Sequence, residues 1–322
     1  MRCGRSWGSP PSEHDVTKSS AVEAKGREGQ TYAGETRLAR WMSFVKLPHT
    51  VFALPFALVG VTLASKTAPL TVEMVAWVVI AFTSARWVAM AVNRIVDREY
   101  DARNPRTAQR EIPRGAINVR DAWMTVVLAA ALFFYAAWSL NPLCAALSPV
   151  ALAWVCFYSF TKRFTRYAHL VLGLGLAIAP VGGYLAVTGA WSEPWWMLIT
   201  LTIAVMTWSG GFDVLYALPD VDFDRSQGLH SIPAAVGVPT AIAIARVLHV
   251  TTVLALGATV WVTGGHWLAW AGVATAAVLL AYEHSLVKDD DLSKLDAAFF
   301  TMNGVISLSF FGWMLADRIF LS

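Results

Sequence analysis

Acidic side chains recur at regular spacing after two of the apolar segments of this chain. The first group is Asn93, Asp97 and Asp101, and the second is Asp220 and Asp224. Residues four apart share a face of a helix, so each group predicts one polar stripe, the first roughly 12 Å long. Carboxylates are costly near a bilayer and are rarely placed there without a partner. Two opposed acidic stripes would repel each other unless a cation lay between them. Oxygen ligands of this kind suit Mg²⁺, which commonly joins a few carboxylates to substrate phosphates, so the stripes predict a diphosphate site.

Side chains near the stripes could perform the remaining chemistry of such a site. Fixed cations and carboxylate-held metal ions stabilise a departing diphosphate. Arg98 is interleaved with the first stripe and suits bidentate phosphate contact, whereas Lys162 would act as a point charge. Aromatic faces stabilise an allylic cation through their quadrupoles. The aromatic candidates on the adjoining apolar segments are Tyr158, Trp208 and Tyr216.

The elements that must position these residues are membrane-spanning helices. Of the 322 residues, 56% are apolar and only 15% are charged, whereas about 25% are charged in a typical soluble protein. Apolar runs of about 20 residues predict an all-α membrane protein with nine transmembrane helices. The expected spans are approximately 44–65, 72–96, 119–140, 142–161, 168–189, 194–218, 238–263, 266–285 and 296–317. They form one domain, residues 37–322, and the lipid bilayer is an expected partner, whereas nucleic acid is not.

The first 36 residues are polar and rich in glycine, serine and charge, which predicts a disordered N-terminal tail rather than a signal peptide. The three cysteines indicate neither a metal site nor a disulfide framework.

Basic residues are concentrated in alternate connections between the expected spans. These residues are Arg94, Arg98, Arg103, Arg106, Arg110, Arg114 and Arg120 after the second span, Lys162, Arg163 and Arg166 after the fourth, Arg225 after the sixth, and Lys288 and Lys294 after the eighth. The other connections contain little positive charge beyond Lys66. The positive-inside rule therefore places the N-terminus and both acidic stripes on the cytoplasmic side of the cytoplasmic membrane, and the C-terminus outside.

Other interpretations of the same residues have to be weighed. A single acidic pair at a helix end usually marks a solvated membrane boundary, and an arginine in a connection can serve topology alone. Two stripes with equal spacing, both beside arginine-rich connections, favour a site. A cation-coupled transporter is the rival class, but it would need polar groups at the midplane of the membrane. This chain concentrates its polar groups at one face.

The two motifs resemble the signatures of the UbiA superfamily of intramembrane aromatic prenyltransferases. The matching segments are Asn93-x3-Asp97-x3-Asp101-Ala-Arg-Asn-Pro-Arg-Thr107 and Tyr216-Ala-x2-Asp220-x3-Asp224, within about residues 40–320. The resemblance implies Mg²⁺-dependent transfer of a polyprenyl group from polyprenyl diphosphate to an aromatic ring. It also implies that Asn93, Asp97, Asp101, Asp220 and Asp224 hold the metal and the diphosphate, with Arg98 and Lys162 as diphosphate contacts. Pro219 departs from the family, which usually has glutamine there, and a proline breaks the helix before Asp220.

The acceptor expected from the resemblance is a hydroxylated aromatic carboxylic acid of quinone biosynthesis. Segments 46–55 and 212–233 look most like a bacterial group assigned to menaquinone synthesis through futalosine. This likeness predicts 1,4-dihydroxy-6-naphthoate as acceptor, with 4-hydroxybenzoate, the ubiquinone-route acceptor, as the alternative. Lys46 or Arg86 is the candidate partner of the acceptor carboxylate.

Overall fold

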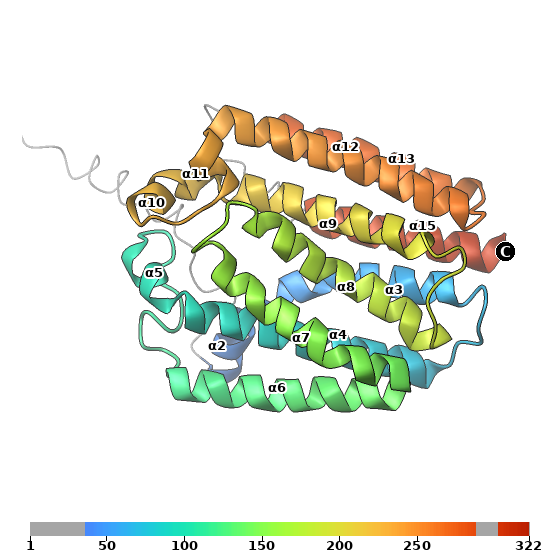
Figure 1. The fold of residues 1–322 in the computed structure, drawn as a ribbon, viewed down its shortest axis with the longest axis horizontal. Helices are drawn as coiled ribbons and strands as arrows, with labels where there is room; N and C mark the ends of the chain where they lie inside the picture. The colour runs from blue at the N-terminus through green and yellow to red at the C-terminus, as the bar shows by residue number, and fades with distance from the viewer. Residues whose placement is uncertain (1–35, 288–301, 322) are drawn as a thin grey trace, which may run out of the picture.

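The computed structural model describes residues 36–287 and 302–321, and the regular structure in these ranges is helical. The long helices lie side by side along the length of the molecule (Figure 1). In chain order the elements are α2 (Arg37–Phe44), α3 (Leu47–Ala64), α4 (Val72–Val96), α5 (Arg98–Arg103), α6 (Val119–Leu140), α7 (Pro142–Thr161), α8 (Ala168–Thr188), α9 (Met197–Tyr216), the 3₁₀ turn η1 (Leu218–Asp220), α10 (Val221–Ser226), α11 (Ile232–Val236), α12 (Val238–Val262), α13 (Trp267–Leu286) and α15 (Asn303–Phe320).

Six of these helices, α4, α6, α7, α8, α9 and α12, are long and apolar enough to cross a membrane, judged on the described part of the chain. The prediction of a multi-pass membrane protein is therefore confirmed. The three other predicted spans also overlap helices, namely α3, α13 and α15, although residues 296–301 of the last span lie outside the described residues. Within α3 the apolar portion is shorter, Ala53–Ala64. Membrane crossing by these three helices stays a prediction, and the proposed N-terminal tail lies almost wholly outside the described residues.

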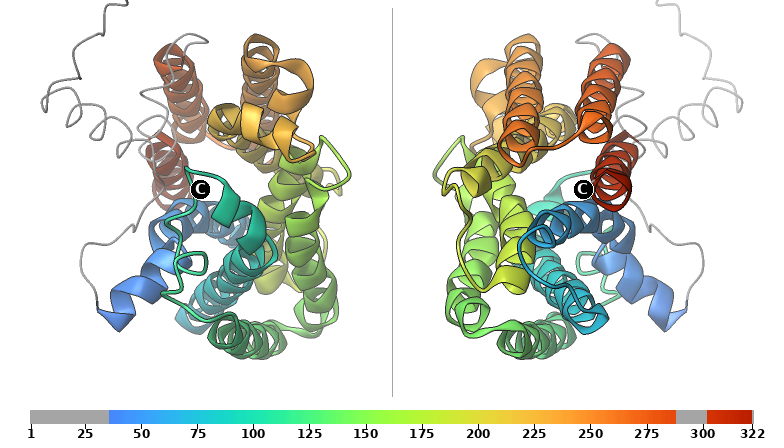
Figure 2. Two further views of the ribbon diagram at one scale, coloured as in Figure 1. Left: turned by 90° about the vertical axis from the view of Figure 1, so that its left-hand side faces the viewer. Right: turned by 90° about the vertical axis from the view of Figure 1, so that its right-hand side faces the viewer.

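In the two end-on views the long helices are arranged in a ring (Figure 2). The short elements α5, α10 and α11 gather at one end of the bundle, and the C-terminus lies at the other end (Figure 1). The two predicted motifs thus share one end of the molecule, as the charge pattern indicates. The cytoplasmic location of this end stays a prediction from the distribution of basic residues.

Capping residues set the ends of the helices that carry the site. Thr71 begins α4, because its hydroxyl accepts a hydrogen bond from the backbone N–H of Met74 at 3.1 Å. Asn141 begins α7 in the same way, accepting from the N–H of Cys144 at 2.9 Å. The amide of Asn141 also donates to the carbonyl of Leu185 at 2.9 Å. That bond ties the start of α7 to the end of α8.

Close helix contacts at glycine pack α8 against two neighbours. A Cβ at Gly173 would collide with the carbonyl oxygen of Met206 in α9, and one at Gly183 would collide with that of Ala57 in α3. The absence of a side chain at Gly173 and Gly183 therefore lets α8 pack closely against both helices. These contacts bring α8, α9 and α3 together beneath the polar end of the bundle.

Both motifs interrupt their helices, which corrects the expectation of two continuous stripes. α4 ends at Val96, and Asp97 (φ −91°, ψ 4°) separates it from α5, which carries Asp101. In the second motif α9 ends at Tyr216, and η1, which contains Pro219, precedes α10. The proline accounts for this second break, because it cannot continue the hydrogen bonding of an α-helix. Asp220 therefore lies in the turn and Asp224 in the next short helix.

Candidate functional site

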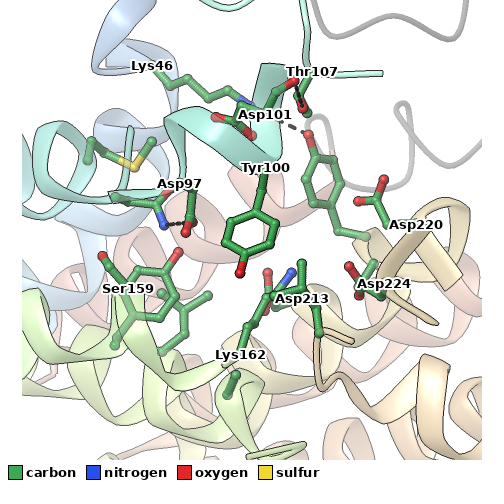
Figure 3. A pocket seen from close by; sticks show the side chains of 18 of the residues that line it. Lys46, Asp97, Tyr100, Asp101, Thr107, Ser159, Lys162, Asp213, Asp220 and Asp224 are labelled. Atoms are coloured by element: carbon green, nitrogen blue, oxygen red, sulfur yellow. Dashed lines mark hydrogen bonds between the residues drawn. The ribbon is translucent and has the colours of Figure 1, made fainter. Parts of the chain in front are cut away.

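A polar cavity of about 210 Å³ lies at the end of the bundle where both motifs meet. Its walls come from α4, α5 and the connection that follows, α7, α9 and α10. Eleven of the residues selected from the sequence line it: Lys46, Arg86, Asn93, Asp97, Asp101, Tyr158, Lys162, Trp208, Tyr216, Asp220 and Asp224. Figure 3 shows several of these side chains pointing toward one another.

Arg98 is the exception among the selected residues. It does not line the cavity. Its guanidinium donates to the carbonyl of Ile95 at 2.9 Å and forms an ion pair with Glu99 at 3.1 Å. Its expected contact with diphosphate thus finds no support in the geometry.

The first motif is held together by local contacts. The Asn93 amide donates to an Asp97 carboxylate oxygen at 2.9 Å. The guanidinium of Arg163, at the end of α7, lies 3.7 Å from the other Asp97 oxygen. Burial, and then the negative charge of Asp101, raise the pKa of Asp97 to about 6. Protonation of this carboxylate is therefore easier than usual, and a further cation nearby would favour its ionised form.

Asp101 is buried and pairs with an arginine of the same connection. One guanidinium nitrogen of Arg110 donates to both Asp101 oxygens, at 2.7 and 2.9 Å. The backbone carbonyl of Asp101 also accepts from the Thr107 hydroxyl at 3.1 Å. These contacts fold the arginine-rich connection back onto α5, and two of its arginines, Arg106 and Arg110, line the cavity.

Asp220 joins the second motif to the first. Its carboxylate accepts from Arg106 Nε at 2.9 Å, from a second Arg106 nitrogen, and from the Asn104 amide at 3.0 Å. Burial alone would raise the pKa of Asp220, but the charge and hydrogen bonds of Arg106 hold it below the usual value. Asp220 is consequently ionised. Its contacts join the connection after α5 to the turn after α9, and we call this joined polar edge of the cavity the rim.

Lys162 lies beside carboxylates from both motifs (Figure 3). Burial would lower the pKa of Lys162, but the charges of Asp224, Asp213 and Asp220 raise it. The lysine is therefore a fixed cation inside the cavity. It carries the point charge that the sequence predicted at this position.

The oxygen donors of the cavity fit a divalent cation shared with a diphosphate. Asp224 is only 3% exposed, and one of its carboxylate oxygens has no hydrogen-bond partner among the described residues. No three histidine, cysteine or acidic side chains in this part of the chain converge closely enough to hold a metal by themselves. Mg²⁺ is usually held by one or two carboxylates together with substrate phosphates and water. The orphaned Asp224 oxygen and the neighbouring carboxylates match that mode of binding.

An apolar chamber of about 500 Å³ adjoins the polar cavity. It lies between α4, α6, α7 and α8, and small residues such as Ala81, Ala85 and Gly182 form much of its wall. The two spaces share lining residues, namely Arg86, Met90, Tyr158, Leu172 and Leu176. Val150, which also lines the chamber, is 68% exposed. The chamber thus reaches the outer surface of the bundle, where lipid would lie.

Lys46 and Arg86 enter the cavity from different sides. Lys46 donates to the hydroxyl of Tyr216 at 3.5 Å, and burial, followed by the charges of nearby arginines, lowers its pKa well below the usual value. The Arg106 guanidinium lies 4.9 Å from the centre of the Tyr216 ring. Arg86 lies at the junction with the chamber, and its Nε is buried without a hydrogen-bond partner in the described structure.

Several cavity residues had not been selected individually from the sequence. Arg106 belongs to the family-like segment 93–107 and Arg110 to the basic connection, but their distances from Asp101, five and nine residues, give no face-sharing signal. Asp213 lies in the 212–233 segment but outside the two acidic stripes. Its spacing of seven from Asp220 is two helical turns and could have drawn attention to it. Asn104 lies in the family-like segment 93–107, but neither its charge nor its spacing singles it out.

Comparisons with known proteins agree with this geometry. The sequence profile of the UbiA prenyltransferase family matches residues 53–305. Two relatives are named 4-hydroxybenzoate octaprenyltransferase. The protein from Sodalis glossinidius is 30% identical over 231 residues, 72% of this chain and 78% of its own length. The protein from Klebsiella pneumoniae is 28% identical over 240 residues, 73% of this chain and 82% of its own length.

Solved structures show the same fold. A UbiA homologue from Aeropyrum pernix K1 in its apo form has a TM-score of 0.77 and 32% identity, and the match covers 84% of this chain and 98% of that one. A UbiA homologue from Archaeoglobus fulgidus bound to DMAPP and Mg²⁺ has a TM-score of 0.68 and 19% identity, with 88% and 100% covered.

Proposed function

Because the chain belongs to the UbiA prenyltransferase family, we propose that it transfers a polyprenyl group from its diphosphate to a hydroxylated aromatic acid within the membrane. The observation that carries this proposal is the junction of the two spaces. A cavity rich in carboxylates and cations opens into an apolar chamber through shared residues such as Arg86 and Tyr158. A charged head with a long apolar tail fits this pair of spaces.

The diphosphate is bound at the rim by the cations of the cavity. Arg106 and Arg110 are already oriented by Asp220 and Asp101, and Lys162 adds a third positive charge from α7. Preorganised cations of this kind stabilise negative charge that develops on a leaving group. They therefore favour cleavage of the allylic C–O bond.

The carboxylates would share a divalent cation with the diphosphate. Asn93, Asp97, Asp101, Asp220 and Asp224 are the residues that would hold it. Bound there, Mg²⁺ would neutralise the leaving diphosphate as a Lewis acid. The Archaeoglobus fulgidus homologue, which was solved with DMAPP and Mg²⁺, supports this assignment.

The acceptor carboxylate is assigned to Arg86, with Lys46 as the other candidate. Arg86 is a guanidinium at the junction of the two spaces whose Nε lacks a partner in the described structure, so it is suited to an anionic ligand. The relatives named 4-hydroxybenzoate octaprenyltransferase favour 4-hydroxybenzoate over the dihydroxynaphthoate expected first from the sequence. We therefore assign 4-hydroxybenzoate as the acceptor and keep the naphthoate as the competitor to be tested.

A competition assay tests this function. Purified protein in lipid nanodiscs receives Mg²⁺, a polyprenyl diphosphate and both acids, and prenylated products and released pyrophosphate are measured. We expect prenyl-4-hydroxybenzoate to form first. Exclusive prenylation of the naphthoate would overturn the acceptor assignment. Absence of pyrophosphate release with every acceptor would instead favour the transporter class.

The variant Arg86→Gln tests the role of the guanidinium. Its KM for the aromatic acid should rise about tenfold or more, as expected for the loss of a charge-assisted hydrogen bond. Arg246→Gln is the matched control, because Arg246 is an exposed arginine of α12 that does not line the cavity. An unchanged KM in Arg86→Gln would transfer the role to Lys46.

A further inference from the structure

Asp213 is a carboxylate of the cavity that the proposed function has not used. It lies on α9, three residues before this helix ends at Tyr216, whereas Asp220 lies in the turn that follows. Its side chain is 21% exposed and lines the cavity beside Lys162 (Figure 3). The rim carboxylates Asp101 and Asp220 are bound to arginines, whereas Asp213 is bound to a histidine.

Asp213 forms a hydrogen bond with a fully buried histidine. Nδ1 of His169, near the start of α8, lies 2.6 Å from one Asp213 carboxylate oxygen, and the His169 side chain is 0% exposed. The other ring nitrogen, Nε2, accepts a hydrogen bond from the backbone N–H of Ile232 at 3.4 Å. Because Nε2 is an acceptor, the imidazole is neutral and its proton lies on Nδ1, which donates to Asp213.

This arrangement leaves the second oxygen of Asp213 for the cavity. The imidazole contacts Oδ2, so Oδ1 is the oxygen that remains for a ligand in the cavity that Asp213 lines. The charge of Asp213 acts on the ammonium group of Lys162 and on the phenol of Tyr158. Tyr158 lines both the cavity and the chamber, so Asp213 lies close to the junction where the prenyl carbon and the aromatic ring would meet.

We propose that Asp213 accepts the proton lost from the aromatic ring, and that His169 is a positioning residue that orients the Asp213 carboxylate for this step. The inference rests on the proposed function, because only an aromatic acceptor loses a ring proton. It adds a role for two residues that lie outside the paired motifs. The geometry resembles the support that a second group gives to a catalytic base.

The step balances as follows. The allylic C–O bond breaks and its electron pair leaves with the diphosphate. A π pair of the ring forms the new C–C bond to the allylic cation, so the attacked ring carbon holds both a hydrogen and the prenyl group. Asp213 Oδ1 takes that hydrogen as a proton, and the C–H electron pair restores the aromatic ring. The carboxyl group then returns the proton to water at the polar end of the cavity.

Replacing Asp213 with asparagine removes the base and keeps the volume. Turnover should fall about 10²–10⁴-fold, the usual contribution of a positioned base. With acceptor deuterated at the prenylated position, wild type should show no primary isotope effect, and Asp213→Asn should show a clear one because proton loss has become slow. An equal loss of turnover without any isotope effect would overturn the proposal, since the carboxylate would then serve diphosphate binding or cleavage.

His169 contacts both Asp213 and the N–H of Ile232, the first residue of α11. Two substitutions of His169 show which of these contacts matters for the reaction. The amide nitrogen of His169→Asn can replace Nδ1 as the donor to Asp213, whereas the amide oxygen of His169→Gln can replace Nε2 as the acceptor from the Ile232 N–H. We expect His169→Asn to retain more turnover than His169→Gln, and the isotope effect to appear only in His169→Gln. The reverse order would show that the Ile232 contact matters instead and would remove the positioning role.

Two controls make the result specific. Thermal unfolding of each variant shows whether it is folded, and His230→Asn, an exposed histidine that does not line the cavity, should behave as wild type. If Asp213→Asn does not fold, the His169 pair decides the question. A wild-type protein that prenylates no aromatic acid would refute the proposed function itself, which is a different outcome from any of these.

Discussion

The guanidinium of Arg106 binds the carboxylate of Asp220, which lies 114 residues further along the chain. Asn104 donates to the same carboxylate at 3.0 Å, so two residues of the first connection are tied to the second motif. The pair is largely buried, with side-chain exposures of 18% for Arg106 and 10% for Asp220. A rim assembled from distant segments in this way presents cations and carboxylates to one ligand.

The Arg106 contact predicts that Arg106→Lys loses activity although the charge is kept. Lysine cannot reproduce the two-point contact with a carboxylate or phosphate. We expect kcat/KM for the polyprenyl diphosphate to fall about 10²-fold, in the range seen when one preorganised donor is removed. Arg103→Lys is the control, because Arg103 is exposed and donates to Gln227 away from the cavity. Equal effects in the two variants would refute a specific role for Arg106.

The acidic motifs predict a sharp difference between neighbouring aspartates. Asp97→Asn and Asp220→Asn should each abolish transfer at saturating Mg²⁺ while the protein stays inserted and folded, because each removes a charge without removing volume. Asp222→Asn should have a small effect, since Asp222 is exposed and does not line the cavity. Prenyl transfer and thermal unfolding are measured for all three variants. Near-normal turnover in both cavity variants would exclude the shared metal–diphosphate site.

The sequence was sufficient to locate the polar site, because the acidic residues that mark it are close together in the chain. Spacing of four placed Asn93 and Asp97 in contact, and their amide–carboxylate bond keeps that relationship although the helix ends there. The charge pattern likewise placed both motifs at one end of the bundle. What spacing could not show is the break at Asp97, which adopts non-helical backbone angles. The break before Asp220 is the one that Pro219 predicts.

Contacts between distant segments explain the residues that the sequence did not single out. Arg106 is one of many arginines in its connection, and only the fold shows that it reaches Asp220 rather than solvent. His169 lay inside an apolar span, where a histidine carries no spacing signal, and its partner Asp213 is 44 residues away. Arg98 had the better local pattern, yet its guanidinium is occupied by Ile95 and Glu99.

The raised pKa of Asp97 predicts a dependence of metal binding on pH. With a pKa of about 6, caused first by burial and then by Asp101, this carboxylate takes up a proton as the pH falls through 6. A metal ion binds the deprotonated form, so protons and Mg²⁺ compete. The Mg²⁺ concentration for half-maximal activity should therefore be about the same at pH 7 and 8 and rise severalfold at pH 5. A requirement that is constant from pH 5 to 8, in protein that remains folded, would contradict this assignment.

The orientation of the chain is tested by labelling single cysteines in a variant without the native ones. Cysteines at Gln109 and Ser226, near the two motifs, should react with a membrane-impermeant reagent only from the cytoplasmic side. A cysteine at Glu193, in the connection between α8 and α9, should react only from outside. Glu193 is preferable to its neighbour Ser192, which is 2% exposed. Labelling of Ser226 and Glu193 variants from the same side would contradict the proposed topology.

The apolar chamber predicts how the enzyme discriminates between prenyl chains. Gly182 lines the chamber, and a Cβ added there meets no heavy atom within 4 Å, so a larger side chain enters open space. In Gly182→Leu the rate with octaprenyl diphosphate should fall about tenfold, equivalent to about 1.4 kcal/mol, while the rate with geranyl diphosphate stays near wild type. Gly312→Leu is the matched control, because Gly312 is an exposed helical glycine of α15 with equally open space and lies away from the chamber. Equal loss with both chain lengths, or loss with neither, would show that the chamber does not hold the prenyl tail.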